Sequence, residues 1–278
     1  MRNQLLYGGI LLLATACSSP KNFSVEDGNT FIVIDEKASV PAVLAAHELQ
    51  HFVQQSSGIE LPIVNNAPSN GSKLICVGKS PYTAEFDTMK LGEQEYFIKV
   101  SSDKVVLMGQ DENTDRDDGR DNNGITKDRL KVNYSQLVND TASQIELVLP
   151  SVYDAQGTCY AVYDFLEKFV GVRFYGPHPM NVVVPQQTKL QLPVSEIRRT
   201  PDLKYRVGTY SFEWPMMKDQ YFKPSGEMWQ LFLRRIKFGG EKWAANHAFT
   251  SYQDRFLKKN PEHPELFESY HPEYFAQG

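Results

Sequence analysis

Apolar side chains recur at helical spacing between residues 157 and 170. The apolar arc comprises Cys159, Val162, Tyr163, Leu166, Phe169 and Val170, and the residues away from it are Tyr160, Asp164, Glu167 and Lys168. Gly171 follows where a helix end commonly needs a positive φ angle. Residues 172–175 then favour a short strand. The pattern predicts a helix that packs on a sheet and passes through one glycine into a strand.

A second helix is predicted between Ser39 and Gly58. Ser39 is a suitable N-cap, Pro41 suits the first turn, and Gly58 suits the C-terminal end. The positions that face the core are Ala42, Ala45, Ala46, Leu49, Phe52 and Val53. This arrangement places His47 and His51 on the opposite side of the helix, where we expect them to be in water.

Short apolar runs predict the strands of the sheet. They span residues 31–34, 61–64, 74–78, 96–100, 105–108 and 145–149, with further runs at 182–184 and 190–192. The run 74–78 is apolar enough to be buried on both faces. Strands that alternate with helices in this way predict an α/β domain.

Residues 111–143 interrupt this pattern. They are rich in Asp, Asn, Thr and Ser and have no hydrophobic period, so we expect a solvated polar excursion. The acidic stretch 111–119 suggests a calcium loop, but the EF-hand register requires glycine where Arg116 stands. A plain acidic loop is therefore favoured over a calcium site.

The first 17 residues have the pattern of an export signal. Arg2 provides a positive start, residues 5–13 an apolar stretch, and A-T-A-C a small-residue cleavage site that ends in Cys17. This resembles a bacterial lipoprotein signal, which implies a lipid on Cys17, a polar tether at 18–29 and a place in the cell envelope, in the periplasm or at the surface. Alanine three positions before the cysteine leaves a plain secretory signal as the alternative. The apolar run is too short to span a bilayer.

The net charge and the cysteines limit the possible partners and the possible disulfides. The net charge of −5 argues against a nucleic-acid partner, which would need a basic face. Cys76 and Cys159 both lie in apolar surroundings, so two buried thiols are favoured over a disulfide.

Two segments match a known domain in the right order. The sequence G-T-x-Y-A-V-Y-D-F-L-E at 157–167, with G-V-R-F-Y at 171–175, resembles the N-terminal accessory domain that precedes the barrel in α-glucuronidases and β-N-acetylhexosaminidases. The sequences A-A-x-E-L-Q-x-F at 45–52 and S-G-x-E-L-P-I-V at 57–64 look like the first helix and the following strand of the same domain. The pattern is similar to a group of bacterial glycoside-hydrolase-like lipoproteins.

The resemblance implies a fold and a division into domains. We expect an α/β accessory domain at 30–196, with a mixed sheet and covering helices, and the start of a truncated (β/α)8 TIM barrel at 197–278. The order strand 203–207, helix 226–238, strand 243–247 resembles the opening of that barrel. A complete barrel needs about 250 residues, so we expect the chain to be part of a longer or truncated protein.

The candidate substrate-binding residues lie at the ends of the predicted barrel strands, where barrel active sites are built. Asn246 and His247 stand in N-H-A-F, which resembles the family's x-His-x-Phe motif and implies a substrate-facing His247. Trp214 can stack on a sugar and Glu213 can bind hydroxyl groups, whereas Arg206 is a weaker candidate. A purely structural role is the alternative for each of them.

The chain also contains a literal H-E-x-x-H motif. In zinc peptidases two histidines one turn apart bind the metal, and the glutamate activates a metal-bound water. His47, Glu48 and His51 therefore form an alternative zinc site, with Glu60 or Glu85 open as a third ligand. Because the histidines are expected away from the core and the motif has no H-x-x-G-x-x-H continuation, we favour a chance match with no metal. The His-Pro-Glu triplets at 263–265 and 271–273 favour helix starts over metal sites.

These observations predict a lipid-anchored, glycoside-hydrolase-like protein that acts on carbohydrate. Glycosidases normally need two carboxylates across the scissile bond, and no pair in this chain can be assigned. The resemblance implies that the accessory domain is non-catalytic, that the catalytic carboxylates come from later barrel strands, and that no cofactor is required. The alternatives are a non-catalytic glycan-binding lipoprotein and a zinc peptidase.

Overall fold

The computed structural model describes residues 22–69, 71–86, 89–112, 129–140, 142–206, 225–241 and 252–275. The chain divides into two compact units, 1–240 and 241–278. The predicted features outside the described residues are Cys17, most of the acidic loop, Glu213, Trp214, Asn246, His247 and the strand at 243–247. Lipidation and the TIM barrel therefore stay predictions. The division into an accessory domain at 30–196 and a barrel region at 197–278 also stays a prediction.

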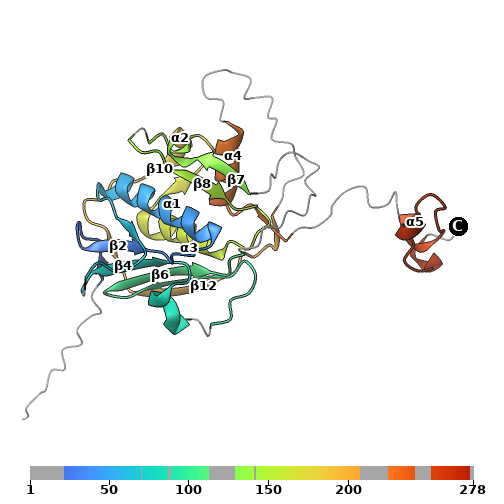
Figure 1. The fold of residues 1–278 in the computed structure, drawn as a ribbon, viewed down its shortest axis with the longest axis horizontal. Helices are drawn as coiled ribbons and strands as arrows, with labels where there is room; N and C mark the ends of the chain where they lie inside the picture. Colours follow the sequence, from blue (N-terminus) through green and yellow to red (C-terminus); the bar gives the residue numbers. More distant parts are fainter. Residues whose placement is uncertain are drawn as a thin grey trace, which may run out of the picture. The chain divides into compact units, whose positions relative to one another are not determined.

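A mixed sheet forms the base of the first unit (Figure 1). The six strands described in it have the order β12-β5-β6-β4-β2-β3. Their bounds are β2 Thr30–Val33, β3 Ile63–Val64, β4 Lys73–Val77, β5 Tyr96–Val100, β6 Lys104–Gly109 and β12 Ser195–Arg199. Strands β2, β3, β4 and β6 are mutually parallel, β5 is antiparallel to β6, and β12 is antiparallel to β5. The mixed α/β fold predicted from the apolar runs is confirmed, and β12 crosses the predicted boundary.

Two helices cover one face of this sheet (Figure 1). Helix α1 is Val40–Ser57, and the Ser39 Oγ accepts a hydrogen bond from the backbone N of Ala42, as the predicted cap requires. Helix α3, Gly157–Phe165, continues as a π-helical turn at Leu166–Val170 and ends at Gly171 with φ of 85°. A smaller apolar cluster on the other face contains Phe97, Val106 and Met108, against Phe86 at the end of the 3-10 helix η1 Pro81–Phe86.

Helix α3 is more buried than its pattern predicts. Every residue from 157 to 165 is buried, including Tyr160 and Asp164 from the side expected to be polar. The reason is that α3 contacts the sheet, α1 and the later helix α4, Gly226–Arg235, so it has no free face in its first two turns. The strand after it, β9 Arg173–Phe174, pairs with β10 Val182–Val183 and does not join the main sheet.

The N-terminal end of the described chain is built into the fold. Strand β1, Phe23–Ser24, pairs with β11, Gln191–Leu192, and the side chain of Phe23 is fully buried. The prediction of a polar tether over 18–29 is therefore wrong for residues 23–25. Phe23 and Val25 supply enough apolar surface to bring that segment onto the core.

The predicted polar excursion is also partly wrong. Strand β7, Leu130–Asn133, pairs with β8, Glu146–Leu149, and the short helix α2, Tyr134–Leu137, follows β7. Val132, Tyr134 and Leu137 are buried in the main core. Figure 1 shows this layer on the side of α1 and α3 away from the sheet. A few apolar residues at the right spacing therefore outweigh the polar composition of the segment.

The region predicted to open a barrel packs on the same core. Strand β13, Tyr205–Arg206, pairs antiparallel with β14, Gly239–Gly240, and α4 lies between them in the chain. The strand at 203–207 and the helix at 226–238 are thus confirmed in shortened form. Ser225 caps α4 by accepting a hydrogen bond from the backbone N of Met228.

The second unit is described over residues 252–275. It contains the short helix α5, Tyr252–Phe256, and 3-10 turns at Pro264–Leu266 and Pro272–Tyr274. Both His-Pro-Glu triplets therefore begin helical turns, as predicted. In each triplet the histidine Nδ1 lies near the glutamate of the same turn, 3.2 Å in the first and 2.7 Å in the second.

Cys76 and Cys159 are buried free thiols, which confirms the favoured alternative. The Cys159 Sγ donates to the backbone oxygen of Pro41 at 3.1 Å, and burial raises the pKa of the Cys76 thiol to about 12. Among the described helices, none has the length and apolar character to cross a membrane.

Candidate functional site

The H-E-x-x-H helix carries a buried carboxylate. Glu48 is fully buried, and its two carboxylate oxygens accept hydrogen bonds from the Arg235 guanidinium, from Nε at 2.7 Å and from Nη2 at 2.8 Å. The Tyr134 hydroxyl donates to the same carboxylate at 2.7 Å. Burial by itself raises the pKa of Glu48, but the ion pair and the hydrogen bonds outweigh it, so this pKa lies below its ordinary value. Glu48 is therefore ionised and saturated by partners from α2 and α4.

Arg235, the partner of Glu48, is also buried, with 3% of its surface exposed. Its guanidinium lies over the rings of Phe52 and Phe174, at 5.1 and 5.3 Å from their centroids. The preceding residue, Arg234, is fully buried and donates to the backbone oxygen of Pro150 and to Gln230. The last turn of α4 is thus fixed to the α/β core by two buried arginines.

His47 and His51 do not lie in water. Their rings are 6.2 and 6.3 Å from the ring of Tyr134, and both side chains are partly buried. The layer formed by β7 and α2 covers this side of α1, which is why the expectation of solvent-exposed histidines is wrong. The His47 Nδ1 is buried and has no partner in the described part of the chain. Burial lowers the pKa of both histidines below 6.5.

This burial predicts a pH-dependent stability. Because the folded-state pKa of each histidine is below 6.5, the unfolded chain binds protons more tightly. The contribution of neutral His47 and His51 is complete above the unfolded pKa and is lost as the pH falls through the window below 6.5. We expect urea titrations to give a lower free energy of unfolding at about pH 5.5 than at about pH 7.5.

The variant His47→Gln/His51→Gln should lose less stability over the same pH range. His263→Gln is the matched control, since this histidine is exposed in the second unit. Equal pH slopes in the double variant and the native chain would contradict the assignment of the effect to these two histidines. The lowered pKa of Glu48 acts in a separate window, below 4.5.

The geometry of this site gives the H-E-x-x-H motif a structural explanation. The glutamate that would activate a metal-bound water is held in an ion pair with Arg235. Within the described ranges, no group of three or more His, Cys, Asp or Glu side chains is placed to hold a metal. Of the two candidate third ligands, Glu85 pairs with Lys104 at 2.8 Å and Glu60 is exposed.

Arg206 is the candidate substrate-binding residue that the structure describes. Its Nε donates to the backbone oxygen of Lys237, and its Nη2 donates to Gln94 Oε1 and to the Tyr160 hydroxyl, both at 3.0 Å. The Nη1 donates to the backbone oxygen of Leu203. These bonds join β13 to α3, to the segment before β5 and to the segment after α4. A role of Arg206 in substrate binding stays a prediction.

Two essential partners in the buried network have no local sequence signal. Tyr134 lies in the segment that composition marks as a loop, and Arg235 stands among the charged residues at the end of an amphipathic helix. Asp111, predicted as part of an acidic loop, is instead a half-buried residue that links α1 and α3 through Ser39 and Thr158. Tyr134 and Arg235 are far from Glu48 in the sequence, and they reach it only because α2 and α4 pack on α1.

Comparisons with known proteins add a weak likeness in fold. No family model matches the chain, and no curated protein matches it. Among solved structures, a GH20 β-N-acetylhexosaminidase from Streptomyces coelicolor A3(2) gives a TM-score of 0.36 at 13% identity, over 68% of this chain and 26% of that one. A family GH115 4-O-methyl-α-glucuronidase with specificity for decorated arabinogalactans gives 0.37 at 14% identity, over 66% and 19%. A mutant Streptomyces plicatus β-hexosaminidase in complex with GlcNAc gives 0.36 at 13%, over 68% and 25%. The chain thus spans about a quarter or less of the length of these enzymes.

Proposed function

We propose that this chain is part of a lipid-anchored, glycoside-hydrolase-like protein that acts on carbohydrate, and that its α/β domain is a non-catalytic support for the region that follows. The observation that carries this proposal is the buried ion pair between Glu48 and Arg235. It gives the H-E-x-x-H helix a structural role, as the resemblance to an accessory domain implies. It also fixes α4, the first helix of the predicted barrel, to the α/β core.

The motifs quoted from the sequence support the carbohydrate assignment. The resemblance implies a substrate-facing His247, and Trp214, in the loop after the first predicted barrel strand, would stack on the sugar. Asn246 and Glu213 would supply hydrogen bonds beside them. Cys17 would carry the lipid, so the protein should partition into the detergent phase of Triton X-114, and Cys17→Ala should move it to the aqueous phase. Aqueous partitioning of the native protein would contradict the anchor.

A glycan array tests the proposed contact with carbohydrate. We expect the chain to bind at least one glycan class, and Trp214→Ala or His247→Ala to weaken that binding about tenfold, the loss that corresponds to about 1.4 kcal/mol of contact. Tyr175→Ala and His263→Ala are matched controls, because both residues are exposed. We also expect no hydrolysis of uronic-acid or N-acetylhexosamine glycosides by this chain.

Two results would contradict the proposal. Absence of binding to every glycan would remove the carbohydrate assignment. Hydrolysis that is lost in Glu48→Gln but retained in Trp214→Ala would place catalysis in the α/β domain and remove its supporting role.

A further inference from the structure

A cavity lies at the edge of the sheet where the parallel strands β2, β4 and β6 end. Its volume is about 660 Å³, within the range of about 300–1,000 Å³ that small-molecule sites occupy. The polar residues that line it are Asp35, Lys37, Ser39, Lys79, Ser80 and Asp111. They come from the segments that follow the three strands and from the start of α1. In open α/β sheets, ligands bind outside the carboxyl ends of the strands.

Asp111 forms the fixed inner wall of this cavity. Its Oδ2 accepts a hydrogen bond from the Ser39 Oγ at 2.6 Å, and its Oδ1 accepts one from the backbone N of Thr158 at 2.9 Å. The carboxylate therefore lies between the N-terminal ends of α1 and α3 and compensates the partial positive charge there. Since both oxygens already accept hydrogen bonds inside the protein, Asp111 belongs to the frame of the cavity.

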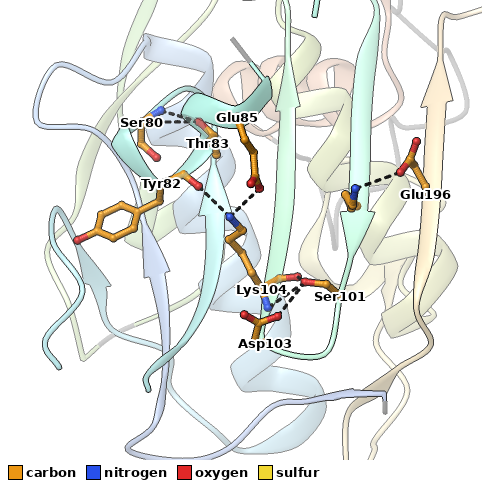
Figure 2. A network of polar contacts seen from close by, with 9 residues as sticks. Ser80, Tyr82, Thr83, Glu85, Ser101, Asp103, Lys104 and Glu196 are labelled. Carbon is orange, nitrogen blue, oxygen red and sulfur yellow. Dashed lines mark hydrogen bonds and ion pairs between the residues drawn. The ribbon is translucent and has the colours of Figure 1, made fainter. Parts of the chain in front are cut away.

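Ser80 carries an unsatisfied hydroxyl beside the cavity. The residue is only 8% exposed, and its hydroxyl oxygen is buried without a hydrogen-bond partner in the described residues. Figure 2 shows how its backbone is held: the backbone N of Ser80 donates to the Thr83 Oγ1 at 2.9 Å, and that hydroxyl donates back to the backbone oxygen of Ser80 at 3.0 Å. The 3-10 helix η1 thus fixes the main chain and leaves the hydroxyl unsatisfied beside the cavity. A buried hydroxyl without a partner costs free energy.

The charges around the cavity balance. Lys37 and Lys79 are exposed at its rim, and neither ammonium group has a hydrogen-bond or ion-pair partner in the described ranges. Asp35 accepts from the backbone N of Lys37 with one oxygen, and its other oxygen is free there. Two lysines therefore face the carboxylates of Asp35 and Asp111. A lining without net charge favours a neutral ligand that both donates and accepts hydrogen bonds.

Small apolar side chains complete the lining. They are Ala38, Ala42, Pro81 and Ala84. A sugar ring combines hydroxyl groups on its edge with apolar C–H groups on its faces, which matches a cavity with free polar groups on some walls and small apolar groups on others.

We propose that this cavity binds a neutral saccharide unit, with Asp35 accepting from its hydroxyl groups and Lys79 and Ser80 donating to them. The inference rests on the proposed function, because it gives the α/β domain its own contact with the carbohydrate. The site lies on residues other than Trp214 and His247, so the two ideas are tested by different variants.

Saturation-transfer NMR on the full chain tests this site with D-glucose, D-galactose and N-acetyl-D-glucosamine as probes. We expect saturable binding of at least one of them. Asp35→Asn and Lys79→Gln should each weaken it about tenfold, the loss for one hydrogen bond to a charged group. Asp35→Asn keeps the acceptor for the Lys37 backbone N. Asp27→Asn and Lys189→Gln are matched controls outside the cavity and should leave the affinity unchanged.

Ser80→Ala supplies a readout that a merely structural serine would not give. Without sugar, its thermal midpoint should equal or exceed that of the native chain, because an unsatisfied hydroxyl is removed, while saccharide affinity should fall severalfold. A lower midpoint with unchanged affinity would overturn the role of Ser80.

The remaining outcomes separate this inference from the proposed function. Glycan binding that is lost in Trp214→Ala but unaffected by Asp35→Asn and Lys79→Gln would overturn the cavity site and leave the proposed function intact. Saturable binding of inorganic phosphate, sensitive to Lys79→Gln and without any saccharide binding, would identify an anion site and overturn the inference. Absence of binding to every glycan and monosaccharide would overturn both.

Discussion

Arg235→Met should lower the free energy of unfolding of the first unit by about 3–5 kcal/mol, the cost of breaking a buried ion pair from one side. The substitution leaves the carboxylate of Glu48 in an apolar site with the Tyr134 hydroxyl as its remaining partner. Methionine fills part of the space between Phe52 and Phe174, so the loss reflects the unpaired charge more than a cavity. Urea denaturation followed by far-UV circular dichroism measures it.

Two further variants test whether the loss of stability comes from the unpaired charge of Glu48. Lys99→Met removes an exposed pair with Glu196 and should change the stability by less than about 1 kcal/mol. The triple variant Glu48→Leu/Tyr134→Phe/Arg235→Met removes every polar group of the network and should recover most of the loss. If Arg235→Met and Lys99→Met had the same effect, the ion pair would not hold α4 to the core.

Gly157→Ala is expected to destabilise the chain by about 3 kcal/mol or more, through overpacking that the backbone cannot relieve. A Cβ atom at Gly157 would lie 2.5 Å from the backbone oxygen of Glu95, 2.7 Å from the backbone N of Gln110 and 2.8 Å from the Cα of Gly109. These atoms are themselves tied by hydrogen bonds, from Gln110 N to Glu95 O and from Gly157 N to Gln110 O. The start of α3 therefore cannot move away without breaking its connection to β6.

Gly226→Ala is the matched control for this substitution. Gly226 also begins a helix, but an added Cβ there meets no atom within 4 Å. The free energy of unfolding of the Gly226→Ala variant should stay unchanged or rise by up to about 1 kcal/mol, because alanine restricts the conformations of the unfolded chain. Thermal unfolding of both variants gives the comparison, and equal midpoints would show that the contact between β6 and α3 is looser than described.

Helices and strands are predicted correctly where neighbouring residues in the sequence mark their ends. Ser39, Pro41 and Gly58 define α1 because capping and helix termination depend on neighbouring residues. The apolar runs predict the strands of the sheet for the same reason. A strand that is buried on both faces is apolar at every position, so its own residues are enough to identify it. Gly171 marks the end of the helix that precedes it.

The surroundings of His47 could not be predicted from the local sequence. The helical pattern of α1 identifies one core face correctly, but it carries no information about a second layer on the opposite side. That layer is formed by Val132, Tyr134 and Leu137, which stand in a polar segment whose composition conceals them. The partner of Glu48 is 187 residues away in the chain. Only the packing of α4 shows that this glutamate belongs to a buried pair.

The burial of Phe23 has a consequence for how the protein would stand on a membrane. Five residues lie between Cys17 and Phe23, so an extended chain over these six residue-to-residue steps reaches about 20 Å. A lipid on Cys17 would therefore hold the end of the molecule that carries β1 and β11 close to the headgroups. Such a short tether would keep the domain close to the membrane surface, so carbohydrate would have to reach the protein there.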